Sequence, residues 1–412
     1  MSELSYLEKL LDGVEVEWKA VGDIAGYSTT KVDADKLDAT SFVGVDNLLA
    51  DKGGRIDATY QPNTARLTAY EPGDILLGNI RPYLKKVWMA ENNGGCSGDV
   101  LAIRILADCK KIISPEYLYY ALSSDSFFSY SMQHAKGAKM PRGSKDAILN
   151  YQIPIPCPSA PRKSLAIQSE IVRILDKFTA LTAELTAELN MRKKQYNYYR
   201  DQLLSFKEGE VEWKALGEVA KIQRGASPRP IVNYLTEQGN GIPWIKIGDT
   251  IPGSKYIDKT LQKITAEGAQ KSRILNPGDF VISNSMSFGR PYILRITGAI
   301  HDGWASISNF GEKLNADYLY HYLSSKKVKN YWESKINSGS VSNLNADIIK
   351  TLPVPLPDKQ KQERISALLD KFDTLTNSIT EGLPREIELR QKQYEYYRDL
   401  LFSFPKPETV SN

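Results

Sequence analysis

The amino-acid sequence predicts an α+β protein: two mixed α/β domains separated by two long antiparallel helices that form a coiled coil, with an internal pseudo-twofold repeat. Two observations predict this class. The chain contains itself twice, because Arg192–Phe206 returns as Arg390–Phe404 and Glu15–Ala25 returns as Glu210–Ala220. Each half also passes from short apolar runs to a long segment with heptad spacing. A repeat at this distance indicates an internal duplication, and 412 residues suffice for two domains.

Further pairs of similar blocks occur in the same order in both halves. They join residues 72–83 to 277–292, 114–124 to 315–325, 153–158 to 352–357, and 175–178 to 369–372. Other stretches have diverged, since Val32–Leu67 has little likeness to Ile231–Ser272. The duplication therefore predicts one shared frame that carries two different surfaces.

We divide the chain along these blocks into an N-terminal helical segment (1–13), a first mixed domain (14–158), a central helical region (159–207), a second mixed domain (208–357) and a C-terminal helical region (358–412). In the first mixed domain, apolar runs such as DILLGNI alternate with Gly, Asn and Pro, which predicts β-rich structure with a helix at Pro115–Ser123. The second mixed domain has the same pattern. Each domain ends in proline-spaced apolar residues, where we expect an extended strand.

The two helical regions carry apolar residues at heptad spacing, which predicts a paired helix. The repeat TAELTAEL at Thr182–Leu189 inserts a stutter into the first helix. The second helix is longer by four residues, since Leu369 to Arg390 spans 21 steps and Leu175 to Arg192 spans 17. Gly382 and Pro384 are expected to kink or break it. The N-terminal YLEKLLDG resembles the end of the first helix, so we expect the C-terminal FSF to meet the N-terminus.

Composition narrows the class of protein. The formal net charge of +4 is weak, so binding to a polyanion has to come from local basic surfaces or from partners. Cys96, Cys109 and Cys157 form no CxxC pair, which is typical of a reduced cytoplasmic compartment. The N-terminus has no secretory pattern, and no run approaches membrane-spanning length. We therefore expect a soluble cytoplasmic protein.

No catalytic motif and no metal site is predicted. The sequence contains no GxxxxGK[ST] phosphate loop, no GxGxxG that opens a helix and no HExxH. Glu17-Trp18-Lys19 and Glu212-Trp213-Lys214 match the carboxylate-x-lysine half of a metal nuclease site. A half-buried tryptophan that anchors the first strand of each domain is the simpler interpretation, and we favour it.

Several loops have suitable chemistry for DNA, because arginine can read guanine edges, asparagine can read adenine edges and lysine can bind phosphates. A solvated turn is the alternative for each of them. In the first domain the candidates are Asn79, Arg81, Tyr83, Lys85, Lys86, Lys136, Lys139, Arg142 and Lys145. In the second domain they are Arg224, Ser227, Arg229, Asn284, Ser287, Arg290, Ser340 and Asn343.

With its TAEL repeat, the segment EIVRILDKFTALTAELTAELNMRKKQYNYYRDQLLSF resembles the central conserved region of type IC specificity subunits of type I restriction-modification systems. The resemblance covers essentially the whole chain. It implies that each mixed domain is a target recognition domain reading half of a split, asymmetric sequence in double-stranded DNA. It also implies a non-catalytic subunit without a cofactor of its own. Two modification subunits with S-adenosylmethionine would methylate adenine, and restriction subunits with ATP and Mg²⁺ would cleave DNA.

The resemblance further implies that the helices set the spacing between the half-sites and dock the modification subunits. We assign partner contacts to Tyr196, Tyr199, Tyr394 and Tyr397 in the repeated helix ends. One alternative is a scaffold that joins two partner proteins without touching DNA, but it gives the divergence of the two domains no purpose. Another is a stand-alone nuclease, for which the Glu-x-Lys strings are the only support.

Overall fold

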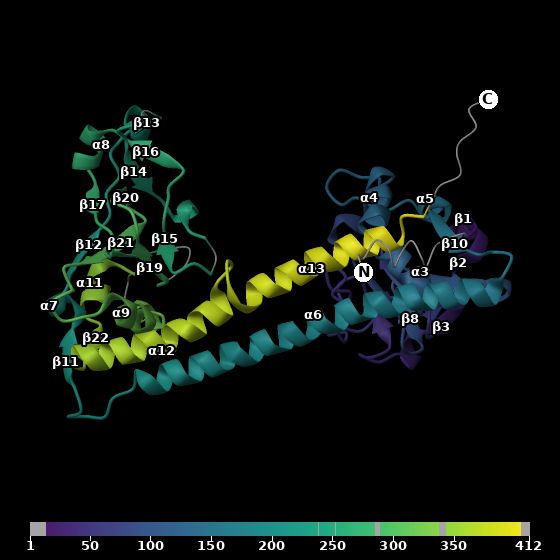
Figure 1. Cartoon of the computed structure of the whole chain (residues 1–412), viewed down its shortest axis with the longest axis horizontal. Coiled ribbons are helices and arrows are strands. Elements are labelled where there is room, and N and C mark those ends of the chain that lie inside the picture. Colours follow the sequence, from purple (N-terminus) through teal and green to yellow (C-terminus); the bar gives the residue numbers. More distant parts are fainter. Residues whose placement is uncertain (1–13, 238, 252, 285–288, 338–342, 405–412) are drawn as a thin grey trace. The chain divides into compact units, whose positions relative to one another are not determined.

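The computed structural model describes residues 14–404, apart from 238, 252, 285–288 and 338–342. The chain forms two compact units. Unit 1 contains the residues up to Thr182 and those from Arg390 onward, and unit 2 contains Ala183–Leu389. Each unit is thus one mixed domain together with parts of both long helical regions (Figure 1).

Unit 1 contains two four-stranded sheets and a two-stranded sheet. The first is antiparallel, in the order β2 (Ala25–Tyr27), β9 (Val100–Ile105), β6 (Ile75–Gly78), β7 (Val87–Met89). The second has the order β3 (Lys31–Asp33), β5 (Arg66–Tyr70), β8 (Gly94–Cys96), β4 (Phe42–Val43), with β4 parallel to β8. Strand β1 (Val16–Ala20) pairs with the proline-spaced β10 (Gln152–Pro156), which confirms the predicted extended strand.

Short helices cover the core of unit 1. They are α2 (Val21–Ile24), α3 (Pro115–Leu122), α4 (Asp125–Gln133) and α5 (Lys145–Asn150), with 3-10 turns η1 (Ala34–Lys36), η2 (Pro82–Leu84) and η3 (Ala107–Cys109). Helix α3 confirms the prediction at Pro115–Ser123. It begins there because the Ser114 hydroxyl accepts a hydrogen bond from the N–H of Tyr117 and Pro115 takes the first helical position.

Unit 2 repeats this plan with two five-stranded sheets. Their orders are β12 (Lys221–Arg224), β21 (Trp304–Ser308), β18 (Phe280–Ser283), β19 (Pro291–Leu294), β15 (Tyr256–Ile257), and β13 (Leu235–Thr236), β16 (Gln262–Ile264), β14 (Ile242–Ile245), β20 (Gly298–Ile300), β17 (Arg273–Leu275). Strand β11 (Glu212–Ala215) pairs with β22 (Pro353–Leu356). The short helices are α7 (Leu216–Val219), α8 (Ala266–Gln270), α9 (Ala316–Leu323), α10 (Lys326–Asn337) and α11 (Ala346–Lys350), with 3-10 turns η4 (Ile231–Asn233) and η5 (Ile247–Asp249).

Strand register corrects one match between the two halves. Ile75 and Phe280 are equivalent residues of the PGD blocks, and they lie opposite Met89 and Ile293 respectively. Counting back three residues from each makes Arg290 equivalent to Lys86. The sequence Arg-Pro-Tyr occurs at Arg81 and again at Arg290, but the two occurrences are therefore not structurally equivalent. The one at Arg81 leads into the η2 turn.

The first long helix, α6 (Pro161–Leu203), is continuous over 43 residues. The second is divided into α12 (Lys359–Asn377) and α13 (Gly382–Leu401), which confirms the predicted break. Gly382 has a φ of +75°, a left-handed conformation that favours glycine. Residues 378–381 lie outside both helices, and these four equal the excess seen in the sequence. With them removed, the 21 steps to Arg390 become 17, as in the first helix.

Equivalent aromatic residues join the two paired helices in each unit, and the two helices of a pair run in opposite directions (Figure 1). In unit 1 the Phe178 ring stacks on Tyr397, with 5.2 Å between centroids. In unit 2 its counterpart Phe372 stacks on Tyr199 at 5.5 Å and on Tyr196 at 6.3 Å. The internal repeat of the sequence is thus a repeat of packing.

The end of α13 belongs to the core of unit 1. Leu401 is 1% exposed and Phe404 is 4% exposed, and both lie in the cluster that holds Leu175 of α6 and Tyr117 of α3. The predicted meeting of the C-terminal FSF with residues 1–13 falls outside the described residues. Within the described part of the chain, no helix is long and apolar enough to cross a membrane.

Candidate nucleic-acid interface

The structure brings the two basic stretches of the first domain together. The peptide N–H groups of Lys136 and Arg142 each donate to the other residue's carbonyl at 2.9 Å, which closes the loop between them. The Arg81 N–H donates to the Pro141 carbonyl at 2.7 Å. Lys136, Lys139 and Arg142 are all exposed, as is Arg81. These cations share one surface, and Tyr83, which is 49% exposed, belongs to the turn that follows Arg81.

Asn79 is corrected from a candidate DNA contact to a buried turn residue. Its side chain is only 8% exposed. Its backbone accepts a hydrogen bond from the Gly143 N–H and donates one to the Asp99 carbonyl. Asn79 therefore fixes the position of the basic loop and has no surface for reading a base edge.

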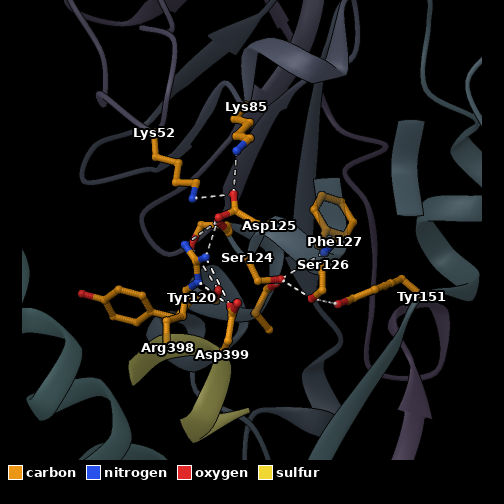
Figure 2. A network of polar contacts seen from close by, with 12 residues as sticks. Lys52, Lys85, Tyr120, Ser124, Asp125, Ser126, Phe127, Tyr151, Arg398 and Asp399 are labelled. Atoms are coloured by element: carbon orange, nitrogen blue, oxygen red, sulfur yellow. Dashed lines mark hydrogen bonds and ion pairs between the residues drawn. The ribbon is translucent and has the colours of Figure 1, made fainter. Parts of the chain in front are cut away.

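Lys85 and Lys86 are tied down within unit 1. The Lys86 ammonium donates to the Val45 carbonyl at 2.7 Å, and the Lys85 ammonium lies 2.8 Å from an oxygen of Asp125. The same oxygen accepts from Lys52 at 3.0 Å. Figure 2 shows Lys52 and Lys85 on one side of Asp125 and Arg398 on the other. Lys85 and Lys86 thus act first as structural anchors.

Asp125 is the centre of this network, which we call the Asp125 cluster (Lys52, Lys85, Asp125 and Arg398). The Arg398 guanidinium is 0% exposed and lies 2.9 Å from the second oxygen of Asp125. Burial alone would raise the pKa of Asp125, but hydrogen bonds from Lys85 and Lys52 and the charge of Arg398 hold that pKa well below its usual range. The cluster connects the C-terminal helix to two loops of the first domain.

Replacing Lys139, Arg142 and Lys145 together by alanine should weaken DNA binding and lower its salt slope by at most about 3, one per lost phosphate contact. Arg142 pairs with Asp99 at 3.1 Å, and the Lys145 ammonium lies 5.8 Å from the centre of the Tyr27 ring. Both cations remain exposed in these contacts, so both are accessible to a phosphate. The measurement is DNA affinity at several salt concentrations.

The control for that variant replaces the exposed Lys110 and Lys111, which follow the opposite end of β9. It should leave the slope unchanged. If the triple variant lost discrimination between sequences at a constant slope, the loop would read bases. An unchanged affinity and slope would make the loop a solvated turn.

In unit 2, four candidate residues converge on one aspartate. Asp302 accepts from the Ser227 hydroxyl at 2.8 Å and pairs with Arg229 at 3.4 Å. Its carbonyl accepts from Arg224 at 3.3 Å and from the Asn284 amide at 3.2 Å. Burial would raise the pKa of Asp302, yet the Ser227 hydrogen bond and the neighbouring His301 lower it. Asp302 therefore holds the segment from Arg224 to Arg229 beside Asn284.

The sequence analysis missed Asp302, Asp125 and Lys52. Asp302 lies in a short turn between β20 and β21, and Lys52 lies in a stretch without a counterpart in the other half. Of the remaining candidates, Arg290 lies 5.2 Å from the Tyr292 ring centre and Asn343 is exposed. Ser287 and Ser340 lie outside the described residues.

The Glu-x-Lys strings form no metal site in the structure. Lys19 pairs with Glu17 at 2.9 Å, and Lys214 pairs with Glu212 at 3.1 Å. Trp18 packs against the core, as the simpler interpretation predicts. No group of three or more potential metal ligands occurs among the described residues.

The structure changes the assignment of the tyrosines. Tyr196 is only 4% exposed, and its hydroxyl lies 3.0 Å from Nδ1 of the buried His321, whose Nε2 lies 2.8 Å from Asp370. Its side chain is inside unit 2 and cannot meet a partner, so this assignment was wrong. Tyr199, Tyr394 and Tyr397 also form aromatic contacts within the helix pairs.

Among the tyrosines of the repeated helix ends, Tyr198 at 61% and Tyr396 at 60% are the most exposed, and they occupy equivalent positions of the repeat. Tyr198 lies two residues after the buried Tyr196, and Tyr396 lies two residues after the half-buried Tyr394. At ~100° per residue this turns the side chain away from the helix pair. The helical period could have identified them from the sequence.

Two copies of a mixed domain, each with arginine-bearing or lysine-bearing loops and built on a shared helical frame, define a two-domain nucleic-acid specificity protein. A family model described as the type I restriction modification DNA specificity domain matches residues 72–192 and 208–389. The chain belongs to this family of type I restriction-modification specificity subunits.

Its relatives carry the same description. The chain is 43% identical to the EcoR124I/EcoR124II specificity subunit of Escherichia coli, with 100% of both chains covered. It is 34% identical to the EcoprrI specificity subunit of Escherichia coli, over 92% of this chain and 93% of that one. It is 32% identical to a putative specificity subunit of Haemophilus influenzae, over 97% and 98%.

Two solved structures share the fold. One, from work on complex assembly and conformational transition of the type I R-M system, has a TM-score of 0.60 at 21% identity and covers 94% of this chain and 97% of that chain. The other, a type I S subunit from M. genitalium, has a TM-score of 0.53 at 14% identity and covers 96% and 98%. At these identities the likeness supports the fold alone.

Proposed function

We propose that this chain is the DNA specificity subunit of a type I restriction-modification complex and is not itself catalytic. Each mixed domain, 14–158 and 208–357, reads one half of a bipartite, asymmetric DNA target. The observation that carries this function is the combination of a frame that is repeated in both halves with loops that differ between them. The repeated helix ends pack alike in both units, whereas the loops around Arg142 and around Asp302 have different chemistry.

The helices set the spacing between the half-sites and dock two modification subunits in this proposal. Tyr198 and Tyr396 are the side chains best placed to contact those subunits, because they are exposed at equivalent positions of the two copies. Restriction subunits complete the complex in the cytoplasm. S-adenosylmethionine, ATP and Mg²⁺ belong to the partner subunits, and the TAEL repeat supports the type IC subgroup.

Exchanging residues 14–158 for the same region of a relative should change one half-site and leave the other intact. The reason is that the exchanged segment lies between blocks of the common frame. The methylation pattern of a genome that expresses the exchanged subunit gives both half-sites and the spacer. Exchanging 208–357 is the matched control and should change only the other half-site.

Loss of both half-sites in an assembled complex would contradict this model. A methylation pattern unchanged by either exchange would instead favour a scaffold that does not touch DNA.

A further inference from the structure

A cationic pocket of about 590 Å³ lies in unit 2, between the helical frame and the second domain. Four basic side chains line it, and Asp373 is its one acidic residue. The basic residues are Lys193 and Arg200 of α6, Arg290 before β19, and Lys329 of α10. The pocket therefore carries three net positive charges, out of +4 for the whole chain.

Two buried donors at this pocket have no acceptor among the described residues. Arg200 is 9% exposed, and its Nε makes no hydrogen bond there. Its Nη2 donates to the Asn197 side chain at 2.8 Å, and its guanidinium lies 5.1 Å from the centre of the Tyr196 ring. The indole N–H of Trp332, which is 1% exposed, has no acceptor either. Buried donors of this kind are uncommon, and beside four cationic side chains they favour a bound acceptor at this pocket.

The duplication shows what occupies the equivalent place in unit 1. Arg398 is the counterpart of Arg200, and Asp125 is the counterpart of Lys326, because each follows the serine that caps its helix. In unit 1 the Asp125 carboxylate accepts from Arg398, Lys52 and Lys85. In unit 2 the arginine is retained as Arg200, whereas Lys52 has no counterpart and strand register aligns Lys85 with Gly289. The other cations of the pocket, Lys193, Arg290 and Lys329, come from positions other than those of Lys52 and Lys85. Lys326 replaces the carboxylate and lines a different, smaller pocket.

We propose that the unit 2 pocket binds a backbone phosphate of DNA, which takes the place of the Asp125 carboxylate. This inference rests on the proposed function. A phosphodiester supplies charged acceptors for several cations at once. Arg290 lies six residues after Asn284 in the chain, and Asn284 is held on Asp302 beside Arg224, so a short stretch of sequence joins the pocket to the candidate interface. The second domain would then be anchored to DNA partly through the helical frame.

Lys329 and Lys326 provide a matched pair for the test, because they are exposed lysines of the same helix and only Lys329 lines the pocket. The complex with the modification subunits is titrated with a 30-base-pair duplex of arbitrary sequence, since a phosphate contact does not depend on sequence. Lys329→Ala should weaken binding by roughly tenfold at 0.1 M salt and reduce the salt slope by about 1. Lys326→Ala should change neither.

A second pair of variants tests the equivalence with unit 1. Lys326→Asp introduces the carboxylate that unit 1 has at this position, so it should pair with Arg200, block the phosphate and raise the melting temperature. Lys327→Asp makes the same change in charge one residue away, at a side chain whose ammonium lies 4.7 Å from the centre of the Trp213 ring and which is not the counterpart of Asp125. DNA binding should fall more for Lys326→Asp than for Lys327→Asp.

Equal salt slopes within both pairs, with the wild-type complex still binding the duplex, would overturn the phosphate site and leave the proposed function intact. A wild-type complex that binds no DNA would contradict the proposed function itself. If Lys329→Ala weakened the binding of modification subunits and left the slope unchanged, a partner's carboxylate would be the ligand. If inorganic phosphate stabilised the wild type while the duplex data showed no difference, the site would be one for free anions. Either result would overturn the inference.

Discussion

Replacing Arg398 by alanine is expected to release the end of α13 from unit 1, at a cost of about 3 kcal/mol for a broken buried ion pair. The Arg398 side chain is 0% exposed and donates both to Asp125 and to the Ser123 carbonyl. Amide exchange at residues 398–404 measures the effect locally. It should accelerate about 100-fold, since ~1.4 kcal/mol corresponds to a factor of ten.

Arg200→Ala is the matched control, because it removes the equivalent arginine, which donates to the Asn197 side chain and forms no ion pair with a carboxylate among the described residues. Exchange at the end of α6 should accelerate far less than exchange at the end of α13. Equal effects of the two substitutions would show that the Asp125 cluster contributes nothing beyond the packing of an arginine.

The same cluster predicts the direction of the pH dependence. The folded-state pKa of Asp125 is held below its usual value, so its contribution to stability is fully present above the unfolded-state pKa of about 4. That contribution is lost as the pH falls through the folded-state pKa. Protection of residues 398–404 should therefore decline in acid in the wild type, and Arg398→Ala should flatten this decline.

Inserting a third TAEL after Leu189 is expected to move the two half-sites apart by about one or two base pairs. Four residues add one turn, about 6 Å of helix at ~1.5 Å per residue, and DNA rises ~3.4 Å per base pair. Most of the apolar heptad positions of α6 stay on the same face, because four residues are close to the ~3.6 residues of one helical turn. Methylation-site mapping measures the spacer, and the half-site bases should not change.

Inserting two residues at the same place is the control. It rotates the following part of α6 by roughly 200°, which removes Tyr196 from Phe372 and His321. Unit 2 should then fail to assemble with modification subunits. An unchanged spacer in the four-residue variant, or altered half-site bases, would show that these helices do not set the distance.

Features that depend on local pattern and on the repeat could be predicted from the sequence. The capped helix at Pro115, the strand at Ile153 and the break at Gly382 each follow from residues beside them in the chain. The pairing of the helices follows from heptad spacing, which is also local. The family resemblance rests on the same repeated segments.

The site was predicted less well, because its geometry depends on contacts between distant residues. Asp302 gathers Ser227 from 75 positions away, and Asp125 meets Arg398 across 273 positions. Neither separation leaves a trace in the local sequence. Similar letters also misled the comparison at Arg81, where strand register and not identity decides which residues correspond.

The break between α12 and α13 bears on how this protein can change its target. The four additional residues of the second helical region, 378–381, form a non-helical segment between α12 and α13. Within it, the Ser378 hydroxyl accepts hydrogen bonds from the N–H groups of Thr380 and Glu381. When extended, four residues reach up to about 13 Å, more than one added turn of α6 requires. A four-codon duplication in one helix therefore needs no matching duplication in the other. New spacings, and with them new DNA targets, can arise in a single genetic step while both recognition domains stay as they are.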